Sequence, residues 1–223
     1  MKQRQTDSGN ALWVILIAIV LLAALTMMLS RSSDTSSDTG DYEQRSIQGS
    51  KVLRYAAGIE LAVNNLKTRG CSENSLSFWH DSDGNGTEDA GDTYYNASAP
   101  TDHSCHIFEP EGAGQVYEAG WNFLGETRVL GLGSDSRIEL LAEYSGLSQI
   151  QCTQINNMIG IANSGTDAPS EDYNQTEFTG TYGTATTNGD TIGNTSAWLA
   201  GQTQSCTKDG AGDYFFNHVL IAR

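Results

Sequence analysis

The pattern of apolar positions near the start of the chain predicts a long apolar helix. Residues 11–29 read ALWVILIAIVLLAALTMML, without a charged side chain and with Thr26 as the only polar one. As a helix this stretch would extend for roughly 28 Å, close to the ~30 Å hydrocarbon core of a bilayer, whereas the apolar core of a signal peptide usually has about 7–15 residues. We therefore predict a transmembrane helix over residues 10–30, preceded by a leader at residues 1–9.

The charges around this helix predict its orientation. Lys2 and Arg4 precede the apolar run, and basic residues favour the cytoplasmic side of a membrane. The expected arrangement is a single-pass protein of the bacterial inner membrane with a cytoplasmic N-terminus. The C-terminal domain would then be periplasmic or extracellular.

The next stretch predicts a linker and then a second helix. Residues 31–41 are polar, with no apolar side chain that could order them, and are interpreted as a linker. Asp41 is a candidate N-cap, and Gly70 after Lys67 is a typical helix end. Between them, apolar residues recur at spacings of three and four, which is typical of a helix with one buried face. These residues are Val52, Ala56, Ile59, Val63 and Leu66.

Beyond Cys71 the pattern changes to short β-like runs separated by Gly, Asp, Asn and Ser. Ser148 and Gln151 form a capping-box pattern that predicts a short helix carrying Cys152. Residues 164–204 are expected to form long loops. The predicted strands are residues 75–79, 106–109, 115–118, 126–132, 137–143 and 214–221. The last of these reads YFFNHVLI, a nearly continuous apolar run, which predicts a central strand that is buried on both faces.

These elements together predict an α+β fold class. After the N-terminal transmembrane helix, we expect a helix packed on an antiparallel β-sheet with long loops, all within one domain at residues 42–223. The number of residues available supports one sizeable domain with its own core, not two.

Four cysteines change this picture by adding crosslinks. An even number of cysteines in a domain outside the cytosol predicts two disulfides, for which three pairings are possible. We predict the pairing that closes the shorter loops. These pairs are Cys71 with Cys105 and Cys152 with Cys206.

The N-terminal residues resemble a known family. Polar residues 1–8, Gly9 and the apolar run that follows are similar to the class III signal segment of type IV pilins and type II secretion pseudopilins. The resemblance implies cleavage between Gly9 and Asn10, and a helix followed by a β-rich region is the pilin layout. Asn10 departs from the usual phenylalanine or methionine. Val14 stands in place of the usual glutamate, which some minor pseudopilins also lack.

A segment rich in carboxylates predicts a calcium site. Residues 81–92 read DSDGNGTEDAGD, the spacing of an EF-hand or dockerin-type loop, in which Gly86 permits the sharp turn. Acidic side chains without a lysine or arginine would repel one another unless a cation such as Ca²⁺ were present. The alternative is a solvated acidic turn. The expected ligands are Asp81, Asp83, Asn85, Thr87 through its carbonyl, Asp89 and Asp92.

Other chemistry has weaker support. His103, Cys105 and His106 could bind a transition metal, but oxidation of Cys105 would remove the thiolate, so we favour turn residues here. The sequence contains no nucleophile-elbow or phosphate-loop pattern, and no enzymatic activity or small-molecule substrate is expected. The net charge of −15 excludes a typical nucleic-acid-binding protein.

The resulting functional hypothesis is a structural one. We expect a pilin-like or minor pseudopilin-like subunit of a membrane-anchored envelope filament or secretion system, a type IV pilus or a type II secretion system. Its expected partners are the inner membrane and other pilin-like subunits. The alternative is a monotopic periplasmic binding domain that is stabilised by calcium and does not enter a filament.

Overall fold

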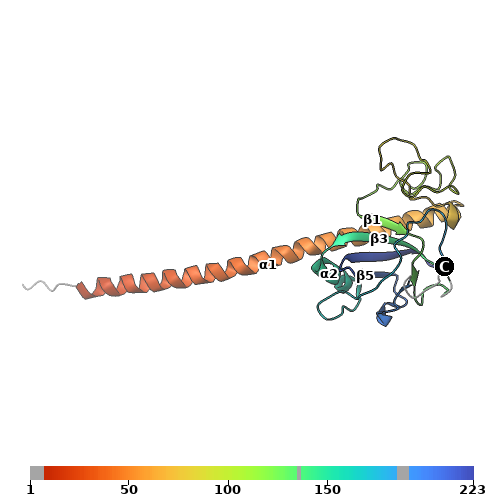
Figure 1. Ribbon diagram of the computed structural model, residues 1–223. Helices are drawn as coiled ribbons and strands as arrows, with labels where there is room; N and C mark the ends of the chain where they lie inside the picture. The colour runs from red at the N-terminus through yellow and green to blue at the C-terminus, as the bar shows by residue number, and fades with distance from the viewer. Residues whose placement is uncertain (1–7, 135–136, 185–190) are drawn as a thin grey trace, which may run out of the picture. The chain divides into compact units, whose positions relative to one another are not determined.

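The computed structural model describes residues 8–134, 137–184 and 191–223, and within the first helix it describes side chains for residues 15–27 and 43–68. Helix α1 runs over Ser8–Thr68 (Figure 1). The chain divides into two compact units, Met1–Arg45 and Ser46–Arg223. Helix α1 therefore contributes its first part to one unit and its last part to the other.

The prediction of a membrane span is wrong. Among the residues that the structure describes, no helix is both long enough and apolar enough to cross a membrane. The transmembrane helix at residues 10–30 is overturned by this finding, and so is the single-pass inner-membrane localisation.

The predicted linker at residues 31–41 is also wrong, because α1 continues through it. Non-glycine residues cost at most about 0.7 kcal/mol each relative to alanine in a helix, and glycine costs about 1 kcal/mol. Helix propagation from flanking turns needs no new nucleation, which is the costly step. A polar composition therefore does not by itself end a helix that is already formed on both sides.

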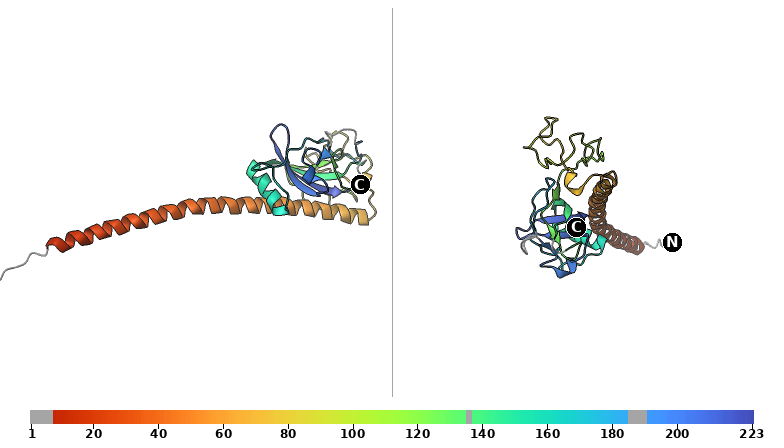
Figure 2. Two further views of the ribbon diagram at one scale, coloured as in Figure 1. Left: turned by 90° about the horizontal axis from the view of Figure 1, so that it is seen from below. Right: turned by 90° about the vertical axis from the view of Figure 1, so that its right-hand side faces the viewer.

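The last part of α1 forms one wall of the core of the second unit. Its buried side chains include all five residues that the spacing predicted, Val52, Ala56, Ile59, Val63 and Leu66. They pack with Phe123, Leu140 and Phe216 of the sheet. Figure 2 shows this part of α1 running along the sheet. Lys67 lies in the last turn, and Gly70 follows with a positive φ of 104°, as the sequence predicted.

The sheet has four antiparallel strands in the order β1-β3-β6-β5. The inner strand β6, Tyr214–Ile221, is the predicted central strand and is buried along almost its whole length. The other strands are β1 (Trp121–Leu124), β3 (Leu140–Leu147) and β5 (Gln204–Lys208). A separate two-stranded parallel pair joins β2 (Arg128–Val129) to β4 (Thr191–Ile192). The combination of helices with an antiparallel sheet therefore agrees with the predicted α+β fold class only in part.

Two apolar clusters explain why β6 is buried on both faces. Phe216 and Leu220 belong to the cluster that includes α1, whereas Val219 belongs to a second cluster. The second cluster includes Ile161, Ile192 and Leu199, which come from the long segment between α2 and β5 that contains β4. This segment covers one face of the sheet, and α1 covers the other.

Helix α2 spans Gln149–Ile159 and starts as predicted, with Ser148 and Gln151 forming a complete capping box. It packs beside α1 at Gly49, where an added Cβ would lie 3.2 Å from the Met158 sulfur. Two short 3₁₀ helices, η1 (Glu73–Ser75) and η3 (Ala197–Leu199), complete the described elements.

Several predicted strands are not strands in the structure. Residues 75–79 and 106–109 share a single bridge, Ser77 with His106, and residues 115–118 lie outside the strands. Within residues 126–132, only the two residues of β2 form a strand. Residues 137–143 overlap the first half of β3. Strands β1 and β5 were missed, and so was β4, which lies within the predicted loops of residues 164–204. The segment from η1 to β1 therefore consists of loops (Figure 1), which carry most of the candidate chemistry.

Both predicted disulfides are confirmed with the predicted pairing. Cys71–Cys105 joins the end of α1 to the loop region, and Cys152–Cys206 joins α2 to β5. Each cross-link thus ties a helix or its end to a segment distant in sequence.

Candidate functional site

The first candidate site is the apolar segment of α1 at residues 15–27. Its large apolar side chains are each between 47% and 74% exposed. At 100° per residue they surround the whole helix, with no gap wider than about 60°. They are Ile15, Leu16, Ile17, Ile19, Val20, Leu21, Leu22, Leu25 and Met27. Gly9 and Asn10 belong to the start of α1. Cleavage between these two residues stays a prediction.

The second candidate site is the acidic loop at residues 81–92. Its first half curls around its own side chains: Asp81 accepts a hydrogen bond from the backbone N–H of Gly86 at 3.2 Å, and Asp83 accepts one from that of Asn85 at 3.1 Å. Asn85 in turn accepts from the N–H of Thr87 at 2.7 Å. Positive φ values at Gly84 and Gly86, 75° and 74°, permit this tight path.

The second half of the loop is held differently. Asp92 accepts hydrogen bonds from Trp79 Nε1 at 2.8 Å and from the backbone N–H of Asp89 at 2.9 Å. In the described part of the chain, no three carboxylates of the loop place oxygen atoms within 4.8 Å of one another. The structure thus arranges Asp81, Asp83 and Asn85 locally but does not gather the full predicted ligand set, and calcium binding stays a prediction.

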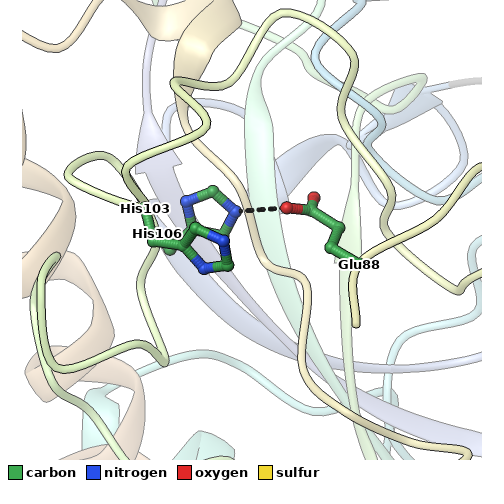
Figure 3. Close-up of side chains that lie close together, drawn as sticks. All are labelled: Glu88, His103 and His106. Atoms are coloured by element: carbon green, nitrogen blue, oxygen red, sulfur yellow. Dashed lines mark hydrogen bonds and ion pairs between the residues drawn. The ribbon is translucent and has the colours of Figure 1, made fainter. Parts of the chain in front are cut away.

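The third candidate site is a cluster of Glu88, His103 and His106. Each side chain offers one ligating atom, and the three atoms all lie within 4.8 Å of one another. Figure 3 shows the Glu88 carboxylate facing the two imidazole rings, with Glu88 Oε2 lying 2.9 Å from His106 Nε2. The two rings stack with their centroids 4.5 Å apart.

The local chain path explains how this cluster forms. His106 is fully buried, and its neighbour Cys105 is fixed by the disulfide to Cys71. His103 adopts a positive φ of 59°, a conformation that non-glycine residues seldom adopt. The Trp79 ring packs edge-on against both imidazoles at 5.9 Å and 6.4 Å. A rigid turn thus presents both rings to the loop.

Two polar atoms of the cluster are buried without a hydrogen-bond partner among the described residues. They are Glu88 Oε1 and His106 Nδ1. An unpaired buried polar atom costs about 1–3 kcal/mol. The Glu88–His106 pair therefore does not satisfy its own hydrogen-bonding capacity, and the arrangement leaves ligating atoms available.

Sequence reasoning identified part of this cluster and missed the rest. It singled out His103 and His106 but favoured a turn, and it expected Cys105 to be oxidised, which is confirmed. Glu88 was missed because it stands at the eighth position of the predicted calcium loop, which contributes no ligand. No signal in the sequence pairs Glu88 with His106, since only the fold of the loop brings them together.

Comparison with protein-family models, with curated proteins and with solved structures finds no match for this chain. Its function therefore rests on its own residues and their arrangement.

Proposed function

We propose that this protein is a structural subunit of a filament, similar to a pilin or a minor pseudopilin, and that its role is assembly and not catalysis. The observation that carries the proposal is the exposed apolar segment of α1 at residues 15–27. Its partners would be the same segments of further copies or of other pilin-like subunits.

The distribution of these side chains favours a bundle over a simple pair. A helix that buries one face needs one apolar stripe, whereas a helix that is apolar all round needs neighbours on several sides. Covering a large aliphatic side chain completely contributes about 1.5–3 kcal/mol. The nine exposed side chains therefore provide ample driving force for packing among several helices. The resemblance of residues 1–29 to the pilin signal segment supports the same reading.

The first test is cross-linking of the full chain through an introduced cysteine. The four native cysteines form disulfides, so Ile19→Cys supplies the free thiol. Val116→Cys is the matched control, because Val116 is an apolar residue of the second unit that is 77% exposed. Ile19→Cys should give a ladder of cross-linked species, and Val116→Cys should remain mainly monomeric. Monomer alone in both variants would favour the alternative of a binding domain outside any filament.

We also propose that the acidic loop binds Ca²⁺ through Asp81, Asp83, Asn85, Thr87, Asp89 and Asp92. The hydrogen bonds from the backbone of Gly86, Asn85 and Thr87 to these side chains support a loop that is wrapped toward its own centre. Exported loops of this kind bind Ca²⁺ at about 10⁻⁴–10⁻³ M.

Thermal unfolding of the full chain with chelator, Ca²⁺ or Mg²⁺ tests this second proposal. Calcium at about ten times its dissociation constant should add about 1.4 kcal/mol of stability, a rise of a few degrees in Tm. Mg²⁺ should do less, because it requires near-octahedral geometry at shorter distances. The variant Asp81→Asn/Asp83→Asn should lose the calcium response, whereas Asp172→Asn/Asp213→Asn, which removes the same charge at exposed positions, should keep it. Equal responses would show a solvated acidic turn.

A further inference from the structure

We propose that Glu88, His103 and His106 form a binding site for one divalent transition-metal ion of the zinc class. This site is separate from the predicted calcium ligands, because Glu88 is the residue of the acidic loop that faces the histidines (Figure 3).

The donor set decides which ion the site would take. Two imidazole nitrogens and one carboxylate oxygen suit Zn²⁺ and its neighbours Cu²⁺ and Ni²⁺, whereas Ca²⁺ and Mg²⁺ take mainly oxygen ligands. Three protein ligands of this composition also leave a fourth tetrahedral position open, as in zinc sites that bind water or a further ligand. His103 and Glu88 are only partly buried, so an ion could reach the cluster from solvent.

The spacing of the three atoms is close to what a metal needs. Zinc–nitrogen bonds of about 2.0–2.1 Å place two tetrahedral ligands about 3.4 Å apart. The ligating atoms of the cluster all lie within 4.8 Å of one another, and Glu88 Oε2 and His106 Nε2 are 2.9 Å apart. Side-chain rotations that change these separations by no more than about 1.4 Å would therefore bring the three atoms to the spacing of metal ligands.

The surroundings indicate a built site and not a chance meeting of side chains. His106 is fully buried, and it directly follows Cys105, which the disulfide to Cys71 holds in place. Trp79 packs against both imidazole rings. Glu88 Oε1 is buried and has no hydrogen-bond partner among the described residues, so it offers a second oxygen to the same ion.

Metal binding here would have a structural consequence. The ion would link the acidic loop, through Glu88, to the segment that carries His103 and His106. The Cys71–Cys105 disulfide already ties that segment to the end of α1. A bound ion would therefore fasten the acidic loop to the rigid part of the second unit.

The test is direct titration of the full chain, purified without a histidine tag, with Zn²⁺ in competition with a chromogenic chelator. His103→Asn removes one ligand, and asparagine tolerates the positive φ at this position. His80→Asn is the matched control, because His80 stacks on Tyr117 outside the cluster. Glu88→Gln is paired with Glu111→Gln, an exposed glutamate in the same loop region. Circular dichroism and thiol labelling establish that each variant is folded with its disulfides intact.

The wild-type chain should bind one Zn²⁺. Loss of a direct ligand should weaken binding by at least about 100-fold, beyond the about 10–100-fold that outer-shell changes cause. His103→Asn and Glu88→Gln should show this loss, whereas His80→Asn, Glu111→Gln and the acidic-loop variant Asp81→Asn/Asp83→Asn should bind like wild type. Absence of zinc binding in the wild type would overturn the proposal. So would unchanged binding in a folded His103→Asn or Glu88→Gln variant.

Discussion

At the scale of single residues, buried carboxylates are the least expected feature of the second unit. Glu139 and Glu143 are both fully buried, although the sequence places them in an ordinary strand pattern. Glu143 accepts hydrogen bonds from Tyr173 at 2.8 Å and from Asn122 and Gln175 at 3.2 Å. Burial raises the pKa of Glu143, and these hydrogen bonds oppose the rise. Residues distant in sequence therefore determine its environment.

Glu139 has fewer partners and a larger shift. Burial raises its pKa from 4.5 to about 7, and the hydrogen bond from the Val129 N–H at 2.7 Å offsets only part of that effect. Its other carboxyl oxygen has no hydrogen-bond partner among the described residues. The folded protein therefore holds the Glu139 proton more firmly than the unfolded chain does.

This shift predicts a pH dependence of stability. A raised pKa in the folded state stabilises the fold at low pH, and that contribution is lost as the pH rises from about 4.5 through about 7. Since one pKa unit corresponds to about 1.4 kcal/mol, the full loss above pH 7 is on the order of 3 kcal/mol. Glu139→Gln keeps the acceptor for Val129 and should remove this component, so that the variant becomes more stable than wild type above pH 7.

Denaturant unfolding of the full chain from pH 5 to pH 8 measures the effect as the difference between variant and wild type. Glu177→Gln, at an exposed position, is the control and should give a difference that does not vary with pH. A constant difference for Glu139→Gln as well would contradict the assigned origin of the pH dependence.

At the scale of elements, periodic apolar patterns were reliable predictors. The five predicted core residues of the helix are buried, the capping box of α2 is present, and β6 is the central strand. In the helix and in β6 the apolar pattern extends over several residues, and burial accounts for it. The capping box has a different cause, because it satisfies backbone N–H groups at the start of α2. These elements could be predicted because their local preferences agree with the final fold.

Short or polar segments could not be assigned in the same way. Residues 75–79 and 106–109 have β-like composition, but they share one β-bridge with two backbone hydrogen bonds beside the Cys71–Cys105 disulfide, and no longer strand ladder forms between them. Strand β5 reads QSCTK, which has no apolar alternation, and forms because β6 and the Cys152–Cys206 disulfide position it. Tertiary contacts therefore outweigh local preference where the local signal is weak.

The two faces of α1 in the second unit give a matched pair of substitutions. Leu66 is fully buried in the core, whereas Leu61 on the same helix is 62% exposed. Leu66→Ala should lower the free energy of unfolding by about 2–5 kcal/mol, because it removes buried apolar area and leaves a cavity. Leu61→Ala should change it by less than about 0.5 kcal/mol. Equal losses in chemical denaturation would show that α1 does not pack on the sheet through the predicted face.

At the scale of the whole molecule, the candidate sites lie in regions that the core does not specify. The predicted calcium ligands and the Glu88–His103–His106 cluster belong to the loops between η1 and β1. The sequence indicated the acidic loop through its spacing and the histidines through their proximity. It could not indicate that Glu88 would meet them, because that contact depends on the path of a loop without regular structure.

The apolar segment of α1 is the feature on which the proposed assembly depends. Apolar side chains exposed on every side of a helix require a partner, and the proposal assigns that partner to other helices of the same kind. A bundle of several such helices differs from a simple dimer, in which one side of the helix would remain exposed. The two arrangements differ in which positions of residues 15–27 contact a neighbouring helix.

The most direct measurement is therefore a cysteine scan of the full chain over residues 15–27, with the yield of intermolecular cross-links recorded at each position. Packing of this segment among several helices predicts cross-links at positions on all sides of the helix, including Leu16, Ile19 and Leu21, and species larger than a dimer. Cross-links confined to one stripe with a three- and four-residue spacing, or monomer at every position, would contradict it.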